Sequence, residues 1–180
     1  MRRSAFILTS GSLLWLTTLR AGATQRIAIT ISSEDNSLGA KETERLLDSL
    51  SGKILTSHQF QVVDRKRLAA VIAEQGFSNS DYADPKTAAA LGRIVGASRI
   101  LHVSASLEVD NNTGALVSNR EADVSASFQL VGVDTARIIA AGTADGTGQR
   151  RAGDGSDTRI VNQAIDDCAD DLAEQIEAAG

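Results

Sequence analysis

The sequence predicts an α/β fold with a single mixed sheet, made of two N-terminal strands plus a C-terminal antiparallel meander and packed by about four helices. Three observations support this fold class. Strand-like and helix-like segments alternate in the N-terminal part of the chain, and three strand-like segments then follow one another. The chain closes with an amphipathic helix, and no internal repeat or linker divides its 180 residues, so we expect one domain.

The first 23 residues have the three parts of a secretory signal peptide. Arg2 and Arg3 form the charged region, Ala5–Leu19 is largely apolar, and the chain then has small residues that end at Ala23. The apolar stretch of about 15 residues is shorter than the ~20 that a membrane-spanning helix needs. We therefore expect cleavage after Ala23, which leaves residues 24–180 as the mature domain.

The composition narrows the classes of partner. Cys168 is the one thiol, so we expect neither an internal disulfide nor a lipid anchor beside the cleavage site. Removal of Arg2, Arg3 and Arg20 with the signal peptide leaves 15 basic residues against 23 acidic ones, a net charge of −8. The four remaining aromatic residues are too few for a base-stacking platform. We expect no nucleic-acid partner and no direct membrane span after cleavage.

The N-terminal half alternates strands with helices. Residues 26–31, "RIAITI", alternate Ile with smaller residues and predict the first strand. Apolar positions at helical spacing predict a helix over Leu38–Leu55, and Gln59–Val63 predicts a short second strand. Asp64 is placed to cap the next helix, and Gly76 to end it.

The C-terminal half predicts one more helix and then the meander. Asp84 before a proline, with Gly96 after the last apolar residue, marks the third helix. Residues 100–109 and 122–133 each alternate apolar and polar side chains, and the turn "DTAR" leads into a third strand over residues 138–144.

Two segments complete the chain. Thr143–Ser156 is rich in Gly and Asp and predicts a mobile loop. Gly146-x-Gly148 lacks the third glycine and the G-K-[ST] of phosphate-binding loops, and "GDGSD" lacks the stacked copies that a calcium-binding glycine-aspartate repeat needs. From Asp157, an apolar stripe that includes Cys168 predicts the last helix.

No motif in the sequence predicts catalysis, a cofactor or a metal site. His58 and His102 lie 44 positions apart, without the spacing of a metal motif. Cys168 lies on an apolar helix stripe, where a thiol is a small hydrophobe. The pairs Asp166-Asp167 and Asp170-Asp171 are interpreted as solvated charge on the outer face of a helix, which leaves a carboxylate hydrolase only as a remote alternative.

Three stretches together resemble the CsgG/HfaB family of bacterial envelope proteins. They are "VVDRKRLAAVIAEQGFS", "ALGRIVGASRILHVSASL" and "SFQLVGVDTARIIAAGTADG", in this order between residues 62 and 146. The family includes the curli secretion component and the holdfast anchor protein, and it is related in fold to the LpoB activators of penicillin-binding proteins. The positions that carry the resemblance are Asp64, Arg65, Leu68, Glu74, Leu91, Gly92, Gly96, Ala97 and the hairpin over residues 130–139.

The resemblance implies a non-enzymatic periplasmic protein that works through protein partners in assembly, export or scaffolding of envelope or surface structures. The chain departs from the curli component in the segment "DNNTGALVSNR", which is short and has no aromatic residue, so we expect no membrane pore. An LpoB-like regulator of a peptidoglycan synthase is the alternative. Envelope proteins, or further copies of the chain, are the expected partners.

Two surfaces are candidates for partner contact. One is a polar face of the sheet with small side chains, namely Ser104, Ser106, Ser125 and Ser127. The other is the free strand edge of the meander, which can pair with another chain.

The cations at the start of the second helix need compensation, because a helix N-terminus already carries partial positive charge. We expect Arg65 to form an internal salt bridge, either with Asp64 or with a carboxylate of another helix. Lys66 and Arg67 are expected to lie on a solvated face.

Overall fold

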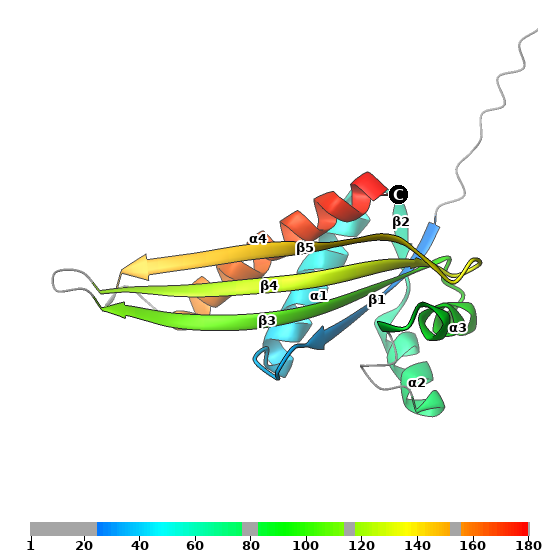
Figure 1. The fold of residues 1–180 in the computed structure, drawn as a ribbon, viewed down its shortest axis with the longest axis horizontal. Helices are drawn as coiled ribbons and strands as arrows, with labels where there is room; N and C mark the ends of the chain where they lie inside the picture. The colour runs from blue at the N-terminus through cyan, green and yellow to red at the C-terminus, as the bar shows by residue number, and fades with distance from the viewer. Residues whose placement is uncertain (1–24, 77–82, 114–117, 152–155, 180) are drawn as a thin grey trace, which may run out of the picture.

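The computed structural model describes residues 25–76, 83–113, 118–151 and 156–179 (Figure 1). The predicted signal peptide and its cleavage site at Ala23 lie outside these residues. Within the described residues, no helix is long and apolar enough to cross a membrane.

The chain forms one five-stranded mixed sheet with four helices, so the predicted fold class is confirmed. The strand order is β2-β1-β3-β4-β5, in which β1 pairs in parallel with β2 and β3, while β3, β4 and β5 form an antiparallel meander. The elements are β1 (Gln25–Ser33), α1 (Ala40–Thr56), β2 (Phe60–Val62), α2 (Arg65–Gln75), α3 (Pro85–Val95), β3 (Arg99–Thr113), β4 (Ser118–Gly132), β5 (Arg137–Arg151) and α4 (Asp157–Ala179).

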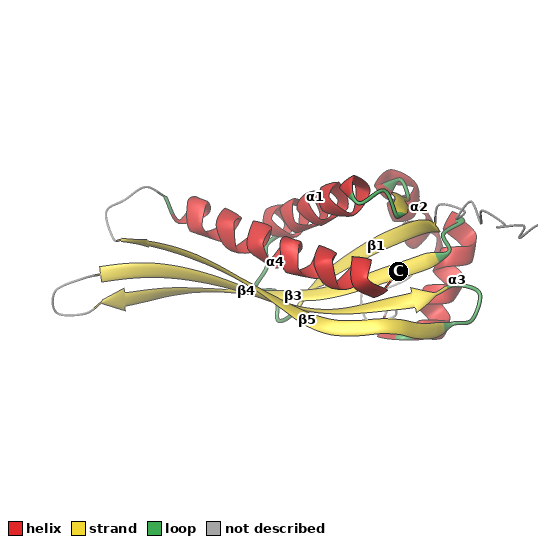
Figure 2. Ribbon diagram, turned by 90° about the horizontal axis from the view of Figure 1, so that it is seen from above, coloured by secondary structure: helices red, strands yellow, loops and turns green. Residues whose placement is uncertain are grey.

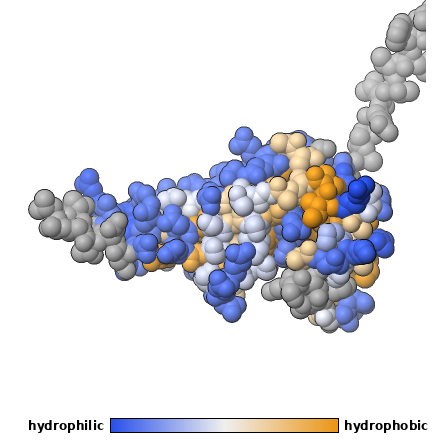
Figure 3. Space-filling model, in the orientation of Figure 1, coloured by the Kyte–Doolittle hydropathy of each residue, from blue (hydrophilic) through white to orange (hydrophobic). Residues whose placement is uncertain are grey.

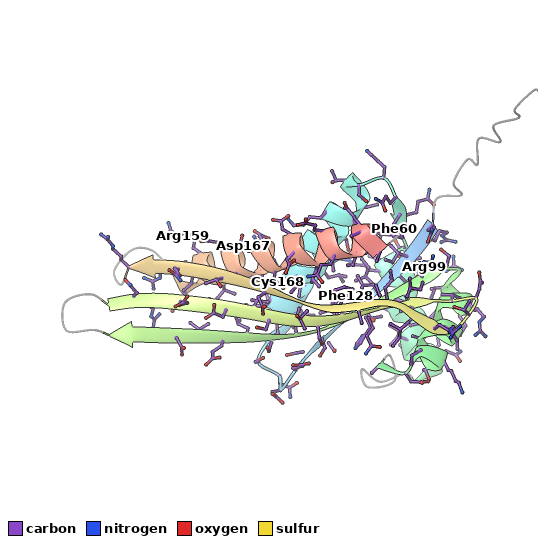
Figure 4. All side chains as sticks on the ribbon, turned by 45° about the horizontal axis from the view of Figure 1, so that its top comes forward. Phe60, Arg99, Phe128, Arg159, Asp167 and Cys168 are labelled. Carbon is purple, nitrogen blue, oxygen red and sulfur yellow. The ribbon has the colours of Figure 1, made fainter. Side chains whose placement is uncertain are left out.

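Helices α1 and α4 cover one face of the sheet and enclose the larger core (Figure 2). The apolar stripe predicted for the last helix faces this core: Ile165, Cys168, Leu172 and Ile176 are each 0% exposed. Cys168 Sγ lies 3.7 Å from the carbonyl oxygen of Ala144 on β5 (Figure 4). Burial is the main reason that the pKa of this thiol rises to about 12, so Cys168 is a structural thiol, as predicted.

Helices α2 and α3 cover only one end of the opposite face. They enclose a smaller core in which Leu68 and Leu91 pack with Ile100 and Val131 of the sheet. Gly92 permits a close approach, since a Cβ at this position would lie 2.3 Å from a methyl group of Val133. The rest of this face, along β3, β4 and β5, has no described helix over it (Figure 2).

The prediction of a loop over Thr143–Ser156 is wrong up to Arg151, because β5 continues through this segment. Residues 142, 144, 146 and 148 are Gly or Ala and point toward α4. A Cβ at Gly146 would lie 2.0 Å from the carbonyl oxygen of Ala164, and one at Gly148 would lie 1.9 Å from that of Ile160. The glycines therefore let the α4 backbone pack directly on the strand, which is a role of strand glycines.

The meander strands are also longer than predicted. β3 extends to Thr113 and β4 begins at Ser118, so most of the segment "DNNTGALVSNR" is strand rather than connection. At the other hairpin, Ala136 has a φ of 50° and its N–H donates to the carbonyl oxygen of Gly132 at 2.8 Å. This turn therefore uses the left-handed conformation without glycine.

Candidate interaction face

The four predicted serines lie together on the uncovered face of the sheet. Ser104 lies opposite Ser127, and Ser106 opposite Ser125, in neighbouring rows of the β3–β4 ladder. Ser125 and Ser127 are exposed, while Ser104 and Ser106 are half-buried. We call this part of the sheet the open face. It is formed by the even-numbered residues 102–110 of β3, the odd-numbered residues 119–129 of β4 and the odd-numbered residues 141–151 of β5.

The serine rows make the middle of the open face low and flat. Thr143 and Asp145 of β5 continue the two rows, so every side chain across them is short. The Ser106 hydroxyl is 3.5 Å from the carbonyl oxygen of Ser125, at the long limit of a hydrogen bond, so this hydroxyl remains largely available to a partner.

The outer part of the open face is acidic, which the sequence interpretation missed. Glu108 lies opposite Asp123, and Asp110 lies opposite Glu121. Like charges directly opposite on one face of a sheet are destabilising. Thr147 donates to Asp123 at 3.0 Å, which relieves this pair in part. The sequence does contain a signal for these acidic residues, because they alternate with apolar residues in the same way as the serines and so lie on the same face of the sheet.

A cavity of about 550 Å³ lies at the inner end of the open face, bordered by His102, Ser104 and Ser127. His102 is 7% exposed, and this burial lowers its pKa, because desolvation disfavours the charged form. Its Nδ1 lies 3.1 Å from the hydroxyl of Thr30. Gln129 Oε1, on the wall of this cavity, is shielded from solvent and has no hydrogen-bond partner among the described residues.

The family-like residues near α2 hold its first turn in place. Asp64 Oδ1 accepts a hydrogen bond from the Arg67 N–H at 2.9 Å, so it is the N-cap. Arg65 donates to Asp48 at 2.6 Å and lies 3.5 Å from Glu44, both on α1. Of the two partners expected for Arg65, the structure shows the carboxylate of another helix.

The other family-like positions have structural surroundings as well. Leu68 is buried, Gly92 contacts Val133, and Gly96 ends α3 with a φ of 73°. The N–H of Ala97 donates to the carbonyl oxygen of Gly92 at 2.8 Å. Glu74 is exposed near the end of α2.

The free edge of the meander is β5, the last strand in the sheet order. At its start Ile138 and Ile139 are 47% and 40% exposed. In Figure 3, hydrophilic residues cover most of the part of β3–β5 that extends to the left, away from α2 and α3. Apolar surface gathers toward the right, at the end of the molecule where these two helices lie. The second predicted contact surface is therefore an edge strand with apolar side chains at one end.

The carboxylates of α4 partly connect helices. Asp166 accepts from Arg45 of α1 at 2.7 Å, and Asp170 pairs with Lys53. Both side chains remain exposed to solvent, Asp166 at 43% and Asp170 at 67%, so these charges are solvated and also pair with cations of α1. Within the described residues, no group of three His, Cys, Asp or Glu side chains is arranged to hold a metal ion.

The fold agrees with those of solved bacterial proteins. The lipoprotein GNA1162 from Neisseria meningitidis matches with a TM-score of 0.54 and 17% identity, over 86% of this chain and 99% of that one. A minor lipoprotein from Acinetobacter baumannii matches with a TM-score of 0.53 and 15% identity, over 86% and 92% of the two chains. The LpoB C-terminal domain from Escherichia coli has 24% identity over 68% of this chain and 82% of that one, with a TM-score of 0.43, which is too low to support the agreement in fold.

Comparison of the sequence with curated proteins gives no match. The family model for "Curli production assembly/transport component CsgG" matches residues 23–178. This match spans every described strand and nearly all of the last helix, and it includes the three stretches that carry the resemblance. The chain therefore belongs to the CsgG family.

Proposed function

We propose that this protein is a non-enzymatic periplasmic assembly, export or scaffold factor of the cell envelope, without a membrane pore of its own, that binds an envelope protein on the open face. Membership in the CsgG family supports the envelope-associated role. The observation that carries the proposal is the open face itself, whose middle rows present short polar side chains on three adjacent strands, beyond the end that α2 and α3 cover.

The core packing, the short side chains and the opposed carboxylates all favour binding of a partner on the open face. Most of the opposite face is covered by α1 and α4, so the fold does not need the open face for its main core. Short side chains let a second surface approach closely and lose little rotamer entropy on binding. The carboxylates of the outer rows favour a partner with basic groups, because that partner would relieve the repulsion between opposed acidic residues.

Two cavities, of about 550 and 560 Å³, are each lined by one carboxylate, Glu34 in the first and Glu44 in the second. Carboxylate-dependent hydrolysis needs two acids that converge on one cleft, and neither of these two cavities supplies such a pair. Two further cavities, of about 340 and 480 Å³, are each lined by three carboxylates. Most of these acids already lie beside a cation: Glu44 and Asp48 beside Arg65, Asp166 beside Arg45, and Asp170 beside Lys53.

Site-specific photo-crosslinking in intact cells tests the proposal. A photoreactive residue at Ser125 should give a discrete crosslinked species, whereas the same residue at Gln163, exposed on α4, serves as the matched control. Mass spectrometry then identifies the partner. A surface-structure or export component supports the proposed role, a peptidoglycan synthase supports the regulator, and a second copy of this chain identifies a homo-oligomer.

Substitution adds an independent readout. Ser125→Arg and Ser127→Arg should abolish the crosslinked species formed from a neighbouring open-face position, because the larger side chains keep a second surface away. Gln163→Arg should leave the species unchanged. Equal crosslinking from Ser125 and Gln163, or none from either in the presence of the native envelope, contradicts a docking role for the open face.

A further inference from the structure

The outer edge of β1 is only partly paired, because β2 is three residues long. β2 pairs with Gln25–Ile27 of β1, whereas β3 pairs with Ile27–Ser33 along the other edge. After β2 the chain turns into α2. The second half of β1 therefore has a strand on one side only.

The hydrogen bonds of β1 show which of its main-chain groups have no neighbouring strand to pair with. Arg26 O accepts from Ser98 N–H and Glu34 N–H donates to Ala105 O, each at 2.8 Å, so the even-numbered residues of β1 face β3. Ile27 O accepts from Val63 N–H on the opposite edge at 2.8 Å. Because main-chain groups alternate along a strand, Ile29 and Ile31 also face the outer edge. Neither has a main-chain hydrogen bond there within the described residues.

An apolar groove adjoins this edge. It has a volume of about 560 Å³ and lies between the end of β1, α1 and α2. Ile31 and Leu47 are half-buried beside it, and Leu38 is buried. The apolar side chains that line the groove are Ile31, Leu38, Ala40, Leu47 and Ala69.

The charged side chains on the rim of the groove favour an occupant with a negative charge. Arg65 is paired with Asp48 and lies near Glu44, so its charge is already balanced within the molecule. Lys66, the other cation on the rim, is exposed and forms no salt bridge within the described residues. A carboxylate is therefore the complementary group for an occupant of this groove.

We propose that this groove binds an extended segment of a partner protein, which continues the line of β2 along the outer edge of β1. Main-chain groups of the segment hydrogen-bond to Ile31, one apolar side chain enters the groove between α1 and α2, and an acidic side chain approaches Lys66. Strand addition of this kind takes affinity from main-chain bonds and specificity from pockets for alternate side chains. The site is separate from the open face, so it stands or fails independently of the proposed function.

The free protein already allows a first test by amide hydrogen exchange. The amide of Ile31 should exchange at least tenfold faster than those of Thr30 and Ser32, which face β3. Equal protection of the three amides would mean that the outer edge is closed, and the proposal would then be withdrawn.

A displayed library of extended heptapeptides tests binding to the mature chain. Selected sequences should alternate apolar residues and contain an acidic residue, and a bound synthetic peptide should slow exchange at Ile31. Ala69→Trp, which fills the groove, should weaken binding at least tenfold, while Ala70→Trp on the same helix but outside the groove should not. Lys66→Glu should weaken binding, and Arg67→Glu is its control.

Three further results, all from the peptide experiment, overturn the proposal. One is the absence of enriched peptides, another is equal binding to the Ala69→Trp and Ala70→Trp variants, and the third is binding without protection of Ile31. If the selected peptides match a segment of this chain and the protein self-associates in sedimentation, the occupant is a second copy, and the proposed partner protein is rejected. Circular dichroism of each variant confirms that loss of binding is not loss of fold.

Discussion

Gly146 and Gly148 determine how closely α4 approaches the sheet. Gly146→Ala and Gly148→Ala should each lower the free energy of unfolding by roughly 1 to 3 kcal/mol, because an added Cβ would collide with helix backbone that cannot move without unpacking the core. Urea denaturation followed by circular dichroism measures the loss. A mobile-loop role for these glycines would predict no loss.

Gly52 supplies the matched control for these two variants. A Cβ at this position of α1 meets no atom within 4 Å. Gly52→Ala should therefore raise the free energy of unfolding by about 0.5 to 1 kcal/mol, through the lower entropy of the unfolded chain. The change in the free energy of unfolding caused by Gly→Ala should then have opposite signs at a packed position and at an open one.

Asp157 makes stability depend on acid pH. Hydrogen bonds from Arg150 and then Arg120 lower the pKa of Asp157 in the folded state. A lowered folded pKa gives stability that is present above the unfolded pKa and is lost as the pH falls through the folded pKa. Asp157→Asn should therefore lower the melting temperature at pH 7, and its difference from the wild type should shrink below about pH 4.

The control for this pH dependence is Asp167→Asn, at an exposed position on the same helix. Thermal scans from pH 3 to pH 7 should show a constant offset, or none, for this variant. A constant offset for Asp157→Asn as well would mean that its ion pairs with the two arginines do not contribute.

At the scale of the element, Arg65 connects α2 to α1. Arg65→Ala should lower the melting temperature more than Lys66→Ala does, because Arg65 reaches Asp48 and Glu44 whereas Lys66 has no salt bridge within the described residues. Arg65 is about half exposed, so the loss should not exceed about 1 kcal/mol. Differential scanning calorimetry can distinguish the melting temperatures of the two variants. Equal decreases for Arg65→Ala and Lys66→Ala would contradict a structural role for Arg65.

Elements marked by local signals could be predicted from the sequence. The limits of α3 follow from Asp84, which caps the Thr87 N–H at 3.0 Å, and from Gly96 at its end. The partner of Arg65 stayed undecided between two carboxylates because the observed one, Asp48, is 17 positions away. Local residues determine a cap, whereas tertiary packing determines such a pair.

The continuation of β5 could not be predicted from its local composition. Gly146 and Gly148 favour a loop by intrinsic propensity, and their strand role depends on α4, which is a tertiary neighbour. Half of the candidate site was predicted, because the serines alternate visibly in the sequence. The groove beside β1 was not, since it results from the shortness of β2 and the position of α2.

At the scale of the whole molecule, the signal peptide predicted for residues 1–23 can be tested directly. The mature protein from the native host should begin at Thr24, as determined by N-terminal sequencing of the periplasmic fraction. Ala23→Arg should retain the longer form, because signal cleavage requires a small residue there. An unprocessed wild-type chain in that fraction would contradict the assignment of residues 1–23.

The close packing of α4 on β5 also has a mechanical consequence. Three strands of 15 residues each, hydrogen-bonded side by side, span about 50 Å. Asp157 fastens one end of α4 to β4 and β5, and Gln175 donates to the carbonyl oxygen of Thr143 near the other end. We expect a sheet braced in this way to resist bending, so that a force on the ends of β3, β4 and β5 near Asp157 is passed along the strands toward the end of the sheet that α2 and α3 cover.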